Sequence, residues 1–391
     1  MESFSRSVIL LGCTGSIGKT ALHGICRSEP GKFLVKALSA HTDFQALAKA
    51  AVDTRCGAVC LTDEHADIGS LQRLLPPHVR CYHGADGLEA MLRELDADIV
   101  LNGIAGAAGL FATLASLDSG KDVALANKES VVMAGQFLLT YAQDRGRRII
   151  PVDSEHSALY ALIGAHGRSH VEQLILTASG GPFRTLPAGS FPDITVEAAI
   201  AHPTWRMGAK ISIDSATLAN KGLEVIEASY LFDFSSDNID VAIHPQSIVH
   251  SLVRLKNGAI YAQMSPSDMT LPIMEALSDG QLALRHVVAP LDFTNLSLTF
   301  EKPDEARFPL LPLAFECSRE RGSYCIAFNA ADEVAAHAFL NRACSFTDIN
   351  RIVEQTLQHD WSESARDYRQ VLIQDAKARR IAEIALNEVA T

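Results

Sequence analysis

Two carboxylates separated by one residue follow a short apolar segment near the middle of the chain. Residues 147–152 are predicted to form a strand, and Asp153 and Glu155 come directly after it. If the backbone stays extended, both side chains lie on one face. Carboxylates this close repel each other unless a cation lies between them, and their hard oxygen atoms suit Mg²⁺ or Mn²⁺. Alternatively, Asp153 and Ser154 cap the helix predicted over residues 158–163.

A second polar cluster lies on a helix predicted over residues 214–228. At about 100° per residue, Asn220, Lys221 and Glu224 lie on one side of this helix. A lysine charge and an asparagine donor suit a phosphate group, and Glu224 would complete a metal site of three carboxylates. The same pattern is also typical of a solvent-exposed helix face that carries lysine and glutamate.

Two loops contain further groups that could bind a substrate. Ser179 opens a Ser-Gly-Gly-Pro loop after the strand predicted over residues 171–178, where a hydroxyl and backbone amides could bind phosphate. A plain Gly-Gly-Pro turn is the alternative. The segment from His202 to Gly208 could form a lid that excludes water from a reacting carbonyl, although Trp205 could equally anchor the core.

The predicted strand over residues 123–126 is followed by Asn127, Lys128 and Glu129. Ligands of parallel α/β sheets bind at the carboxyl ends of the strands, so these side chains are well placed for a cofactor and a substrate. A solvated helix start is the alternative interpretation.

Three glycines with the spacing GxxGxxG follow the apolar strand over residues 8–10. Gly12, Gly15 and Gly18 fit a tight strand-to-helix turn whose amides hold a pyrophosphate, which indicates a dinucleotide site. A tight turn without a ligand is the alternative.

A second strand, over residues 33–39, is joined to the first by a helix over residues 21–26. Residues Ala40, His41 and Thr42 provide no acidic side chain that could bind the ribose of NAD. This absence favours NADP(H) as the cofactor. The nearby Asp43 weakens this preference, and residues 40–42 could also form a simple loop.

Composition limits the remaining possibilities. Alternating helical and strand-like segments in the first part predict a doubly wound parallel sheet, and 391 residues predict two or three domains. A net charge of −12 argues against nucleic acid as a partner. No apolar run reaches membrane-spanning length, and the start of the chain, residues 1–6, is polar. The chain is therefore expected to be cytoplasmic. Its eight cysteines form no CxxC pair and are expected to be reduced, mostly buried thiols.

The later part of the chain is predicted to be mixed and then helical. Residues 248–255 and 259–264 flank Asn257-Gly258, which favours a hairpin with a type I′ turn. Beyond a loop-like stretch, helical periodicity predicts four helices, over residues 311–320, 330–340, 348–359 and 368–389.

Taken together, these motifs resemble those of the 1-deoxy-D-xylulose 5-phosphate reductoisomerases. The resemblance runs through Leu11-Gly-Cys-Thr-Gly-Ser-Ile-Gly18, Leu125-Ala-Asn-Lys-Glu-Ser130, Pro151-Val-Asp-Ser-Glu-His156, Ser179-Gly-Gly-Pro-Phe183, His202-Pro-Thr-Trp-Arg-Met-Gly208, Lys210-Ile-Ser-Ile-Asp-Ser-Ala-Thr217, Asn220-Lys-Gly-Leu-Glu224, His244-Pro-Gln-Ser247 and Asn329-Ala-Ala-Asp-Glu333. It covers nearly the whole chain.

The resemblance implies a role for each motif. The implied metal ligands are Asp153, Glu155 and Glu224, and the implied catalytic residues are these three with Lys128 and His202. The implied cofactor-binding residues are Thr14, Gly15, Ser16, Ile17, Ala40, His41, Thr42, Asn127, Glu129, Met207 and Gly208. The substrate phosphate would be bound by Ser179, Ser215, Asn220 and Lys221. The rest of the substrate would contact Lys128, Ser154, Glu155, His202, Trp205 and Glu224.

The implied reaction is the rearrangement and NADPH-dependent reduction of a phosphorylated ketose, 1-deoxy-D-xylulose 5-phosphate, to 2-C-methyl-D-erythritol 4-phosphate for isoprenoid biosynthesis. It requires Mg²⁺ or Mn²⁺, with Co²⁺ as a further candidate. The resemblance also implies a homodimer. The chain departs from many members at residues 40–43, where those members carry a glycine and a lysine suited to the 2′-phosphate.

We therefore expect an α/β fold made of an N-terminal Rossmann-like parallel sheet, a central α+β catalytic domain and a C-terminal helical bundle. The expected limits are residues 1–150 for the NADPH domain, 151–289 for the catalytic and dimerisation domain, 290–310 for a linker and 311–391 for the helical domain. Two alternatives are another NADP-dependent oxidoreductase, such as a semialdehyde or homoserine dehydrogenase, and a non-catalytic NADP sensor. The metal trio beside a phosphate pocket argues against the first, and the presence of Lys128 with all three carboxylates argues against the second.

Overall fold

A computed structural model describes residues 5–281 and 287–389, which form two compact units. Unit 1 contains Met1–Ser130, Leu138–Ser157 and Asp268–Pro290, and unit 2 contains Val131–Phe137, Ala158–Ser267 and Leu291–Thr391. Parts of three predicted segments lie outside the described residues: 1–4 of the polar start, 282–286 of the central domain and 390–391 at the end. Among the described helices, none is long and apolar enough to cross a membrane.

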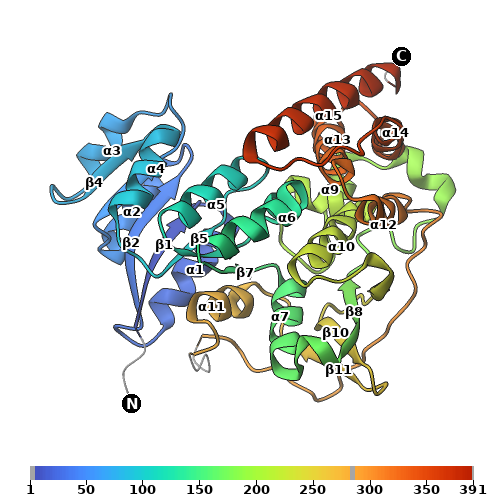
Figure 1. The fold of residues 1–391 in the computed structure, drawn as a ribbon, viewed down its shortest axis with the longest axis horizontal. Coiled ribbons are helices and arrows are strands. Elements are labelled where there is room, and N and C mark those ends of the chain that lie inside the picture. Colours follow the sequence, from blue (N-terminus) through green and yellow to red (C-terminus); the bar gives the residue numbers. More distant parts are fainter. Residues whose placement is uncertain (1–4, 282–286, 390–391) are drawn as a thin grey trace. The chain divides into compact units, whose positions relative to one another are not determined.

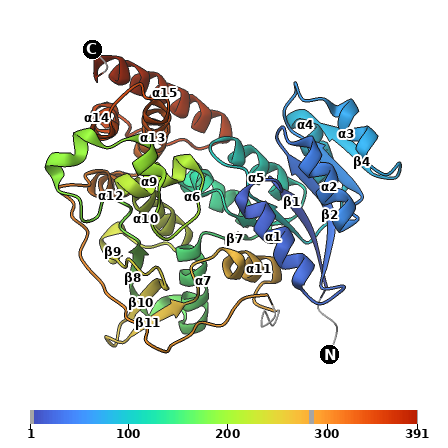
Figure 2. The same cartoon turned by 180° about the vertical axis from the view of Figure 1, so that it is seen from behind.

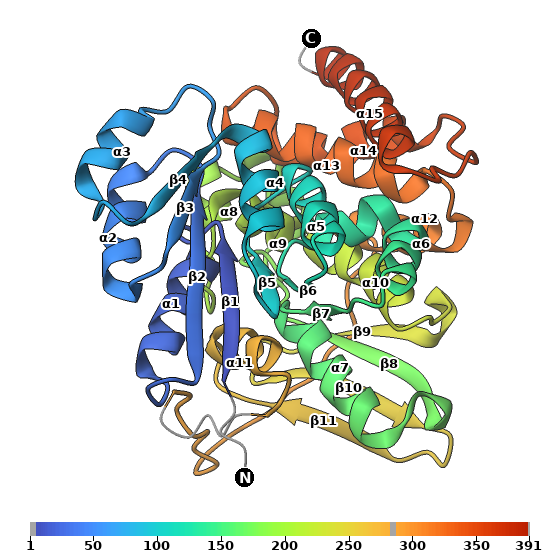
Figure 3. The same cartoon turned by 60° about the vertical axis from the view of Figure 1, so that its left-hand side comes forward.

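Unit 1 is built on a seven-stranded parallel sheet with the order β4-β3-β2-β1-β5-β6-β7 (Figure 3). Its strands are β1 (Arg6–Leu11), β2 (Phe33–Ala40), β3 (Ala58–Leu61), β4 (Arg80–His83), β5 (Ile99–Asn102), β6 (Asp122–Leu125) and β7 (Ile149–Pro151). The strand order reverses between β1 and β5, which is where ligands bind in such sheets. The predicted doubly wound sheet is therefore confirmed.

Helices cover both faces of this sheet because successive residues of β1 point to opposite sides. Val8 and Leu10 join one apolar core, and Ile9 and Leu11 join another. The first core is covered by α1 (Ser16–Arg27), α2 (Phe44–Thr54), α3 (Ile68–Leu74) and α11 (Thr270–Ser278), and the second by α4 (Gly84–Glu94) and α5 (Ala108–Asp118). Although α11 comes late in the sequence, it packs beside α1 (Figure 1).

Unit 2 contains a mixed sheet with the order β11-β10-β8-β9. Its strands are β8 (Val171–Ala178), β9 (Ile239–Ile243), β10 (Val249–Leu255) and β11 (Ile260–Met264). The predicted hairpin is confirmed as the antiparallel pair β10–β11, but the predicted type I′ turn is wrong. The amide of Gly258 bonds the carbonyl of Leu255 at 2.8 Å, and Gly258 instead of Asn257 has the positive φ of 87°. A type I turn followed by a left-handed glycine fits this geometry.

Strands β8, β9 and β10 contribute to one large apolar core of unit 2. Several helices of the unit, which Figure 2 shows around this sheet, contribute to the same core. They are α8 (Val196–Ile200), α9 (Ala209–Thr217), α10 (Ala219–Leu231), α12 (Leu310–Glu320), α13 (Tyr324–Leu340), α14 (Phe346–Leu357) and α15 (Tyr368–Val389). The four helices predicted after residue 310 are confirmed as α12 to α15. Only α13 differs clearly from the prediction, because it begins six residues earlier, at Tyr324.

Candidate active site

The glycine loop after β1 is shaped for a phosphate group. Gly12 has a φ of 74°, and a Cβ atom on Gly18 would lie 2.4 Å from the Cα atom of Cys13. Helix α1 begins at Ser16, its N-cap residue Gly15 makes no side-chain cap, and its first turn contains no acid. The amides at this helix start, with the exposed Gly15 and Ser16 and the half-buried Thr14, can therefore face an anion.

The end of β2 lies beside this loop. The Ser39 hydroxyl accepts the Gly12 amide at 3.1 Å, a contact that the sequence analysis missed. Ala40 is buried, whereas His41 and Thr42 are exposed, and the Nδ1 atom of His41 lies 3.1 Å from the Thr62 hydroxyl. Residues 40–42 thus place no carboxylate at this edge of the loop.

Asp43 does not join that edge. Its carboxylate accepts the Ala46 amide at 2.9 Å and caps the start of α2. The positive end of a helix dipole favours a carboxylate in this position. The acidic residue that made the NADP(H) preference ambiguous in the sequence is therefore engaged with its own helix.

Asn127 joins two elements of unit 1. Its amide donates to the Gly106 carbonyl at 2.9 Å and to Glu129 at 3.0 Å, and its oxygen caps α6 (Lys128–Asp144) through the Ser130 amide. Asn127 is 2% exposed and Lys128 is 6% exposed, so the alternative of a solvated helix start is wrong. The loop beyond β5 is also held by Asn102, whose amide donates to the Gly109 carbonyl at 2.8 Å and which the sequence analysis missed.

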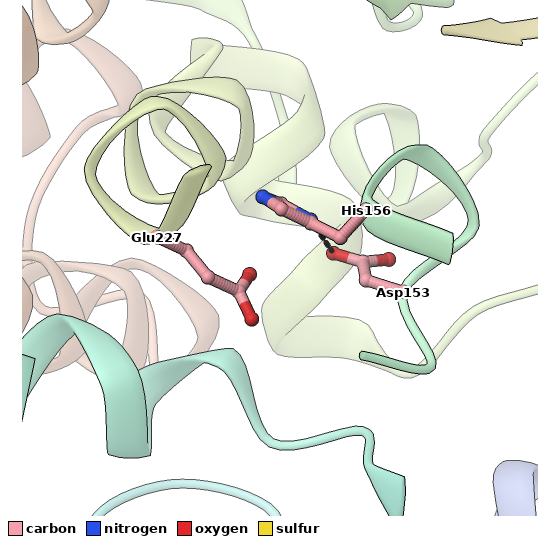
Figure 4. Close-up of side chains that lie close together, drawn as sticks. All are labelled: Asp153, His156 and Glu227. Carbon is pink, nitrogen blue, oxygen red and sulfur yellow. Dashed lines mark ion pairs between the residues drawn. The ribbon is translucent and has the colours of Figure 1, made fainter. Parts of the chain in front are cut away.

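Asp153 and Glu155 lie at the start of a helix and not on one face of a strand, so the prediction of a shared strand face is wrong. Helix α7 (Ser154–His166) begins directly after Asp153, and Glu155 occupies its first turn. Asp153 forms an ion pair with the buried Lys128, and its Oδ2 atom lies 3.9 Å from Nδ1 of the fully buried His156 (Figure 4). The Ser154 hydroxyl donates to Glu155 at 2.6 Å. These carboxylates keep oxygen atoms suited to a hard cation, and Lys128 offsets the charge of Asp153.

Ser179 is the first residue of the Ser-Gly-Gly-Pro loop in unit 2. Gly180 and Gly181 follow with φ values of 84° and 67°, and a Cβ on Gly181 would lie 2.6 Å from the Ser215 carbonyl oxygen. The loop therefore packs directly against the end of α9. The Ser179 hydroxyl accepts the Gly181 amide at 3.3 Å and lies 2.9 Å from the Nε2 atom of His202.

The contacts of His202 determine its protonation. Its Nδ1 atom accepts the amides of Thr204 at 3.1 Å and Trp205 at 2.8 Å, so the proton of the neutral ring lies on Nε2. That proton is donated to Ser179, which leaves the serine hydroxyl proton for another acceptor. Burial lowers the pKa of His202, which favours this neutral form.

The rest of the 202–208 segment is half-buried or exposed. The Trp205 indole is half-buried and 6.2 Å from the His250 ring, so it is not a core anchor. Met207 is half-buried, and Gly208 is the N-cap residue of α9. His250 bonds the Ser265 hydroxyl at 2.9 Å in the interior, which fits a structural role.

The helix predicted over residues 214–228 is divided in two, so that prediction is wrong. Leu218 adopts a φ of 61° between α9 and α10, which places Ser215 before the bend and Asn220 and Lys221 after it. Lys221 forms an ion pair with Glu224, and Asn220 donates to Glu224 at 2.6 Å.

The pair formed by Lys221 and Glu224 is buried, with side-chain exposures of 3% and 1%. The alternative of a solvent-exposed face is therefore wrong. Charges that are removed from water in this way are costly unless they are paired, and they occur mainly at functional sites. An ammonium group beside the unshared amides of a helix start is suited to a phosphate.

Comparisons with known proteins agree along the chain. Family models match residues 8–135 (1-deoxy-D-xylulose 5-phosphate reductoisomerase), 149–232 (the C-terminal domain of that enzyme) and 264–381 (DXP reductoisomerase C-terminal domain). The 1-deoxy-D-xylulose 5-phosphate reductoisomerases of Treponema pallidum and Treponema denticola are 44% and 43% identical, and each match covers 96% of both chains.

Solved structures give the same result. The reductoisomerase from Zymomonas mobilis in complex with NADPH is 39% identical, with a TM-score of 0.90 over 98% of this chain and 99% of that one. A DOX-P reductoisomerase in complex with NADPH, fosmidomycin and magnesium is 37% identical, with a TM-score of 0.89 over 98% of each chain.

Proposed function

The chain belongs to the 1-deoxy-D-xylulose 5-phosphate reductoisomerase family, and we propose how its residues divide the work of that enzyme. The reaction is the NADPH- and metal-dependent conversion of 1-deoxy-D-xylulose 5-phosphate to 2-C-methyl-D-erythritol 4-phosphate. Two lysine–carboxylate pairs with buried lysines, Lys128 with Asp153 and Lys221 with Glu224, carry the assignment of residues. Each pair lies where the motifs require a metal ligand next to a group that binds substrate.

NADPH is assigned to the first unit. Thr14, Gly15, Ser16 and Ile17 would bind the pyrophosphate, since the absence of a Cβ on Gly18 lets α1 approach the loop. His41 and Thr42 would face the 2′-phosphate, next to the buried Ala40. Asn127 and Glu129 would lie along the cofactor, with Met207 and Gly208 near the nicotinamide.

The substrate phosphate is assigned to the second unit. Ser179, Ser215, Asn220 and Lys221 would bind it together with the amides at the start of α10. Ser179 is oriented for this task because its oxygen already accepts two bonds, from Gly181 and His202, so its own proton points elsewhere. Anchoring the phosphate away from the reacting carbons supplies binding energy that can drive closure of the 202–208 segment.

Asp153, Glu155 and Glu224 would hold Mg²⁺ or Mn²⁺, with Co²⁺ as a further candidate, because all three offer carboxylate oxygens. A metal ion held by these three residues would act as a Lewis acid toward the ketone of the substrate. Lys128 and Lys221 now neutralise Asp153 and Glu224, and each ammonium can turn to the substrate once its carboxylate has another cationic partner.

The reacting carbon skeleton is assigned to Lys128, Ser154 and His202. Lys128 would stabilise the negative charge that develops on a substrate oxygen during the reaction. The neutral His202 would lie along the carbon skeleton while its Nε2 proton remains donated to Ser179, and Trp205 would exclude water from the site.

Purified protein tests the proposal with 1-deoxy-D-xylulose 5-phosphate, Mg²⁺ or Mn²⁺, and NADPH, whose oxidation is followed by absorbance. We expect turnover that EDTA abolishes and that is faster with NADPH than with NADH. A folded protein that binds NADPH but does not turn over this substrate would refute the assignment.

We also propose that the enzyme is a homodimer joined at β11. This strand lies at the edge of its sheet, and Ile260 and Tyr261 are 50% and 43% exposed on it. Unpaired edges favour pairing with a second copy. Light scattering should give twice the monomer mass, and Tyr261→Lys should shift the protein toward monomer, whereas an unchanged mass would contradict this interface.

A cytoplasmic location is proposed on the basis of the thiols. All eight cysteines are unpaired, and five of them are buried. Proteins of oxidising compartments commonly use such residues in disulfides. Cell fractionation with activity measurement tests this location.

A further inference from the structure

Lys210 connects two helices of unit 2 that are far apart in the sequence. Its Nζ atom lies 2.6 Å from a carboxylate oxygen of Asp214 on α9 and 2.7 Å from one of Asp332 on α13. The side chains of Asp214 and Asp332 are 4% and 1% exposed, and that of Lys210 is 20% exposed. No motif role assigned above uses this cluster.

Local helix preferences do not explain this lysine. Lys210 lies in the first turn of α9, at the positive end of the helix dipole, where a cation is unfavourable. Its pairing with Asp214 also has the less favourable direction, because the lysine precedes the acid by four residues. Where a sequence opposes a local preference, a tertiary or functional reason is expected. Asp332 supplies the tertiary reason.

The cluster ties α13 to the first turn of a helix, α9, that carries parts of the substrate site. Gly208, the end of the 202–208 segment, is two residues before Lys210, and Ser215 directly follows Asp214. The Ser215 carbonyl also packs against Gly181 of the phosphate loop. A shift at either end of α9 would therefore move Ser215 or the 202–208 segment.

The polar face of α13 is arranged for geometry more than for stability. Asn329, one turn before Asp332, is fully buried, and its side-chain amide has no hydrogen-bond partner among the described residues. Oδ1 of Asp332 likewise has none. Buried charges and unsatisfied amides lower stability, and apolar residues would pack at least as well.

We propose that Asp332 is a positioning residue for the substrate: through Lys210 it sets the position of α9, and hence of Ser215 and the 202–208 segment. No part of α13 needs to touch the substrate. The proposal rests on the function proposed above, in particular on Ser215 binding the substrate phosphate.

The test compares Asp332→Asn with Glu333→Gln in the full-length enzyme. Glu333 is the next residue on α13 and is also ion-paired, but with Arg379 of α15 and not with α9. We expect Asp332→Asn to raise the KM for 1-deoxy-D-xylulose 5-phosphate about tenfold, since misplaced binding groups cost at least this much. The Kd for NADPH should stay within about twofold in both variants, and Glu333→Gln should keep the wild-type KM.

The outcomes separate the two proposals. Absence of turnover in the wild type would refute the function itself. A wild-type KM in folded Asp332→Asn, or an equal rise in Glu333→Gln, would overturn the positioning role while the function stands. If Asp332→Asn does not fold, Lys210→Gln must raise the KM in the same way, and Lys210→Arg, which keeps the charge, must restore most of it.

Discussion

Replacing Gly18 with alanine should weaken NADPH binding more than it weakens the fold. The new Cβ atom would lie 2.4 Å from the Cα of Cys13 and 2.5 Å from the carbonyl oxygen of Gly12. Carbon atoms pack favourably at about 3.5 Å or more, so α1 and the loop must separate by about 1 Å. All of the nearest atoms belong to the backbone, so no side chain can move aside.

The expected magnitude follows from the cost of overpacking, which is about 1–3 kcal/mol. If the loop relaxes by opening, the Kd for NADPH rises about 5- to 150-fold, because each ~1.4 kcal/mol is a factor of ten. Alanine also favours a helix by about 1 kcal/mol relative to glycine, which offsets part of the loss in the free energy of unfolding.

A fluorescence titration with NADPH measures the effect, and Gly24→Ala is the matched control. Gly24 lies on the same helix, and its Cβ would lie 2.5 Å from the sulfur and 2.9 Å from Cγ of Met274, which belong to a flexible side chain and not to the backbone. This control should keep its Kd within about twofold. A Gly18→Ala protein with wild-type affinity, or a control that loses as much, would refute the steric argument.

Three further predictions concern the two halves of the site. Lys221→Gln should raise the KM for the substrate at least about tenfold in steady-state kinetics, with the Kd for NADPH unchanged, because a charged hydrogen bond to the phosphate is lost. Burial lowers the pKa of His202 below its ordinary 6.5, so as the pH falls the unfolded chain binds the proton first. The stability contribution of His202 is thus present above about pH 6.5 and is lost as the pH falls through the folded pKa. Thermal melting temperatures and kcat/KM, measured from pH 8 to 5, should both fall over this range. In His202→Asn, the melting temperature should depend less on pH. His41→Lys should tighten NADPH binding about two- to fivefold in a low-salt titration and leave NADH unchanged, since a permanent charge would then face the 2′-phosphate.

Each of these predictions has a result that contradicts it. A wild-type KM in Lys221→Gln would remove that lysine from the phosphate site. A melting temperature that does not fall between pH 8 and 5 would mean that the folded protein does not hold His202 in its neutral form. An equal gain for NADH and NADPH in His41→Lys would show that residue 41 does not face the 2′-phosphate.

Steric and periodic signals made much of the fold predictable from the sequence. The glycine loop was recognisable because Gly12 and Gly18 occupy positions where a Cβ would collide with backbone. The helices after residue 310 were recognisable because their apolar residues repeat with helical spacing. Both signals are local, so neither depends on knowing the tertiary structure.

The bend at Leu218 carried no such signal. Left-handed backbone usually marks itself with glycine or asparagine, but here a leucine adopts a φ of 61°. Its side chain is 2% exposed within the large core, so packing holds a conformation that the residue itself disfavours. The helical spacing of Asn220, Lys221 and Glu224 was predicted correctly. The burial of Lys221 and Glu224, and the separation of all three residues from Ser215, were not predicted.

Contacts between distant residues were also beyond the sequence. Lys210 and Asp332 are 122 residues apart, and their pairing depends on how α9 and α13 pack. The side chain of Asp43 gave a misleading signal, because a carboxylate at the end of β2 can bind a ribose or cap a helix, and only the structure distinguishes these roles.

The return of α11 to the first unit has a consequence for how the protein is made. Val8 and Leu10 of β1 share a core with Ile273 and Leu277 of α11. Helices α1, α2 and α3 can cover part of this sheet face early, but the part that α11 covers stays exposed on the ribosome until residue 278 has emerged. At about 5–20 residues per second, the residues from 131 to 268 alone delay that event by roughly 7–30 seconds. During this interval the nascent chain exposes an apolar surface that chaperones can bind. For the same reason, a fragment that stops at residue 150 would be prone to aggregate, whereas a fragment with residues 268–290 joined to it would cover its core.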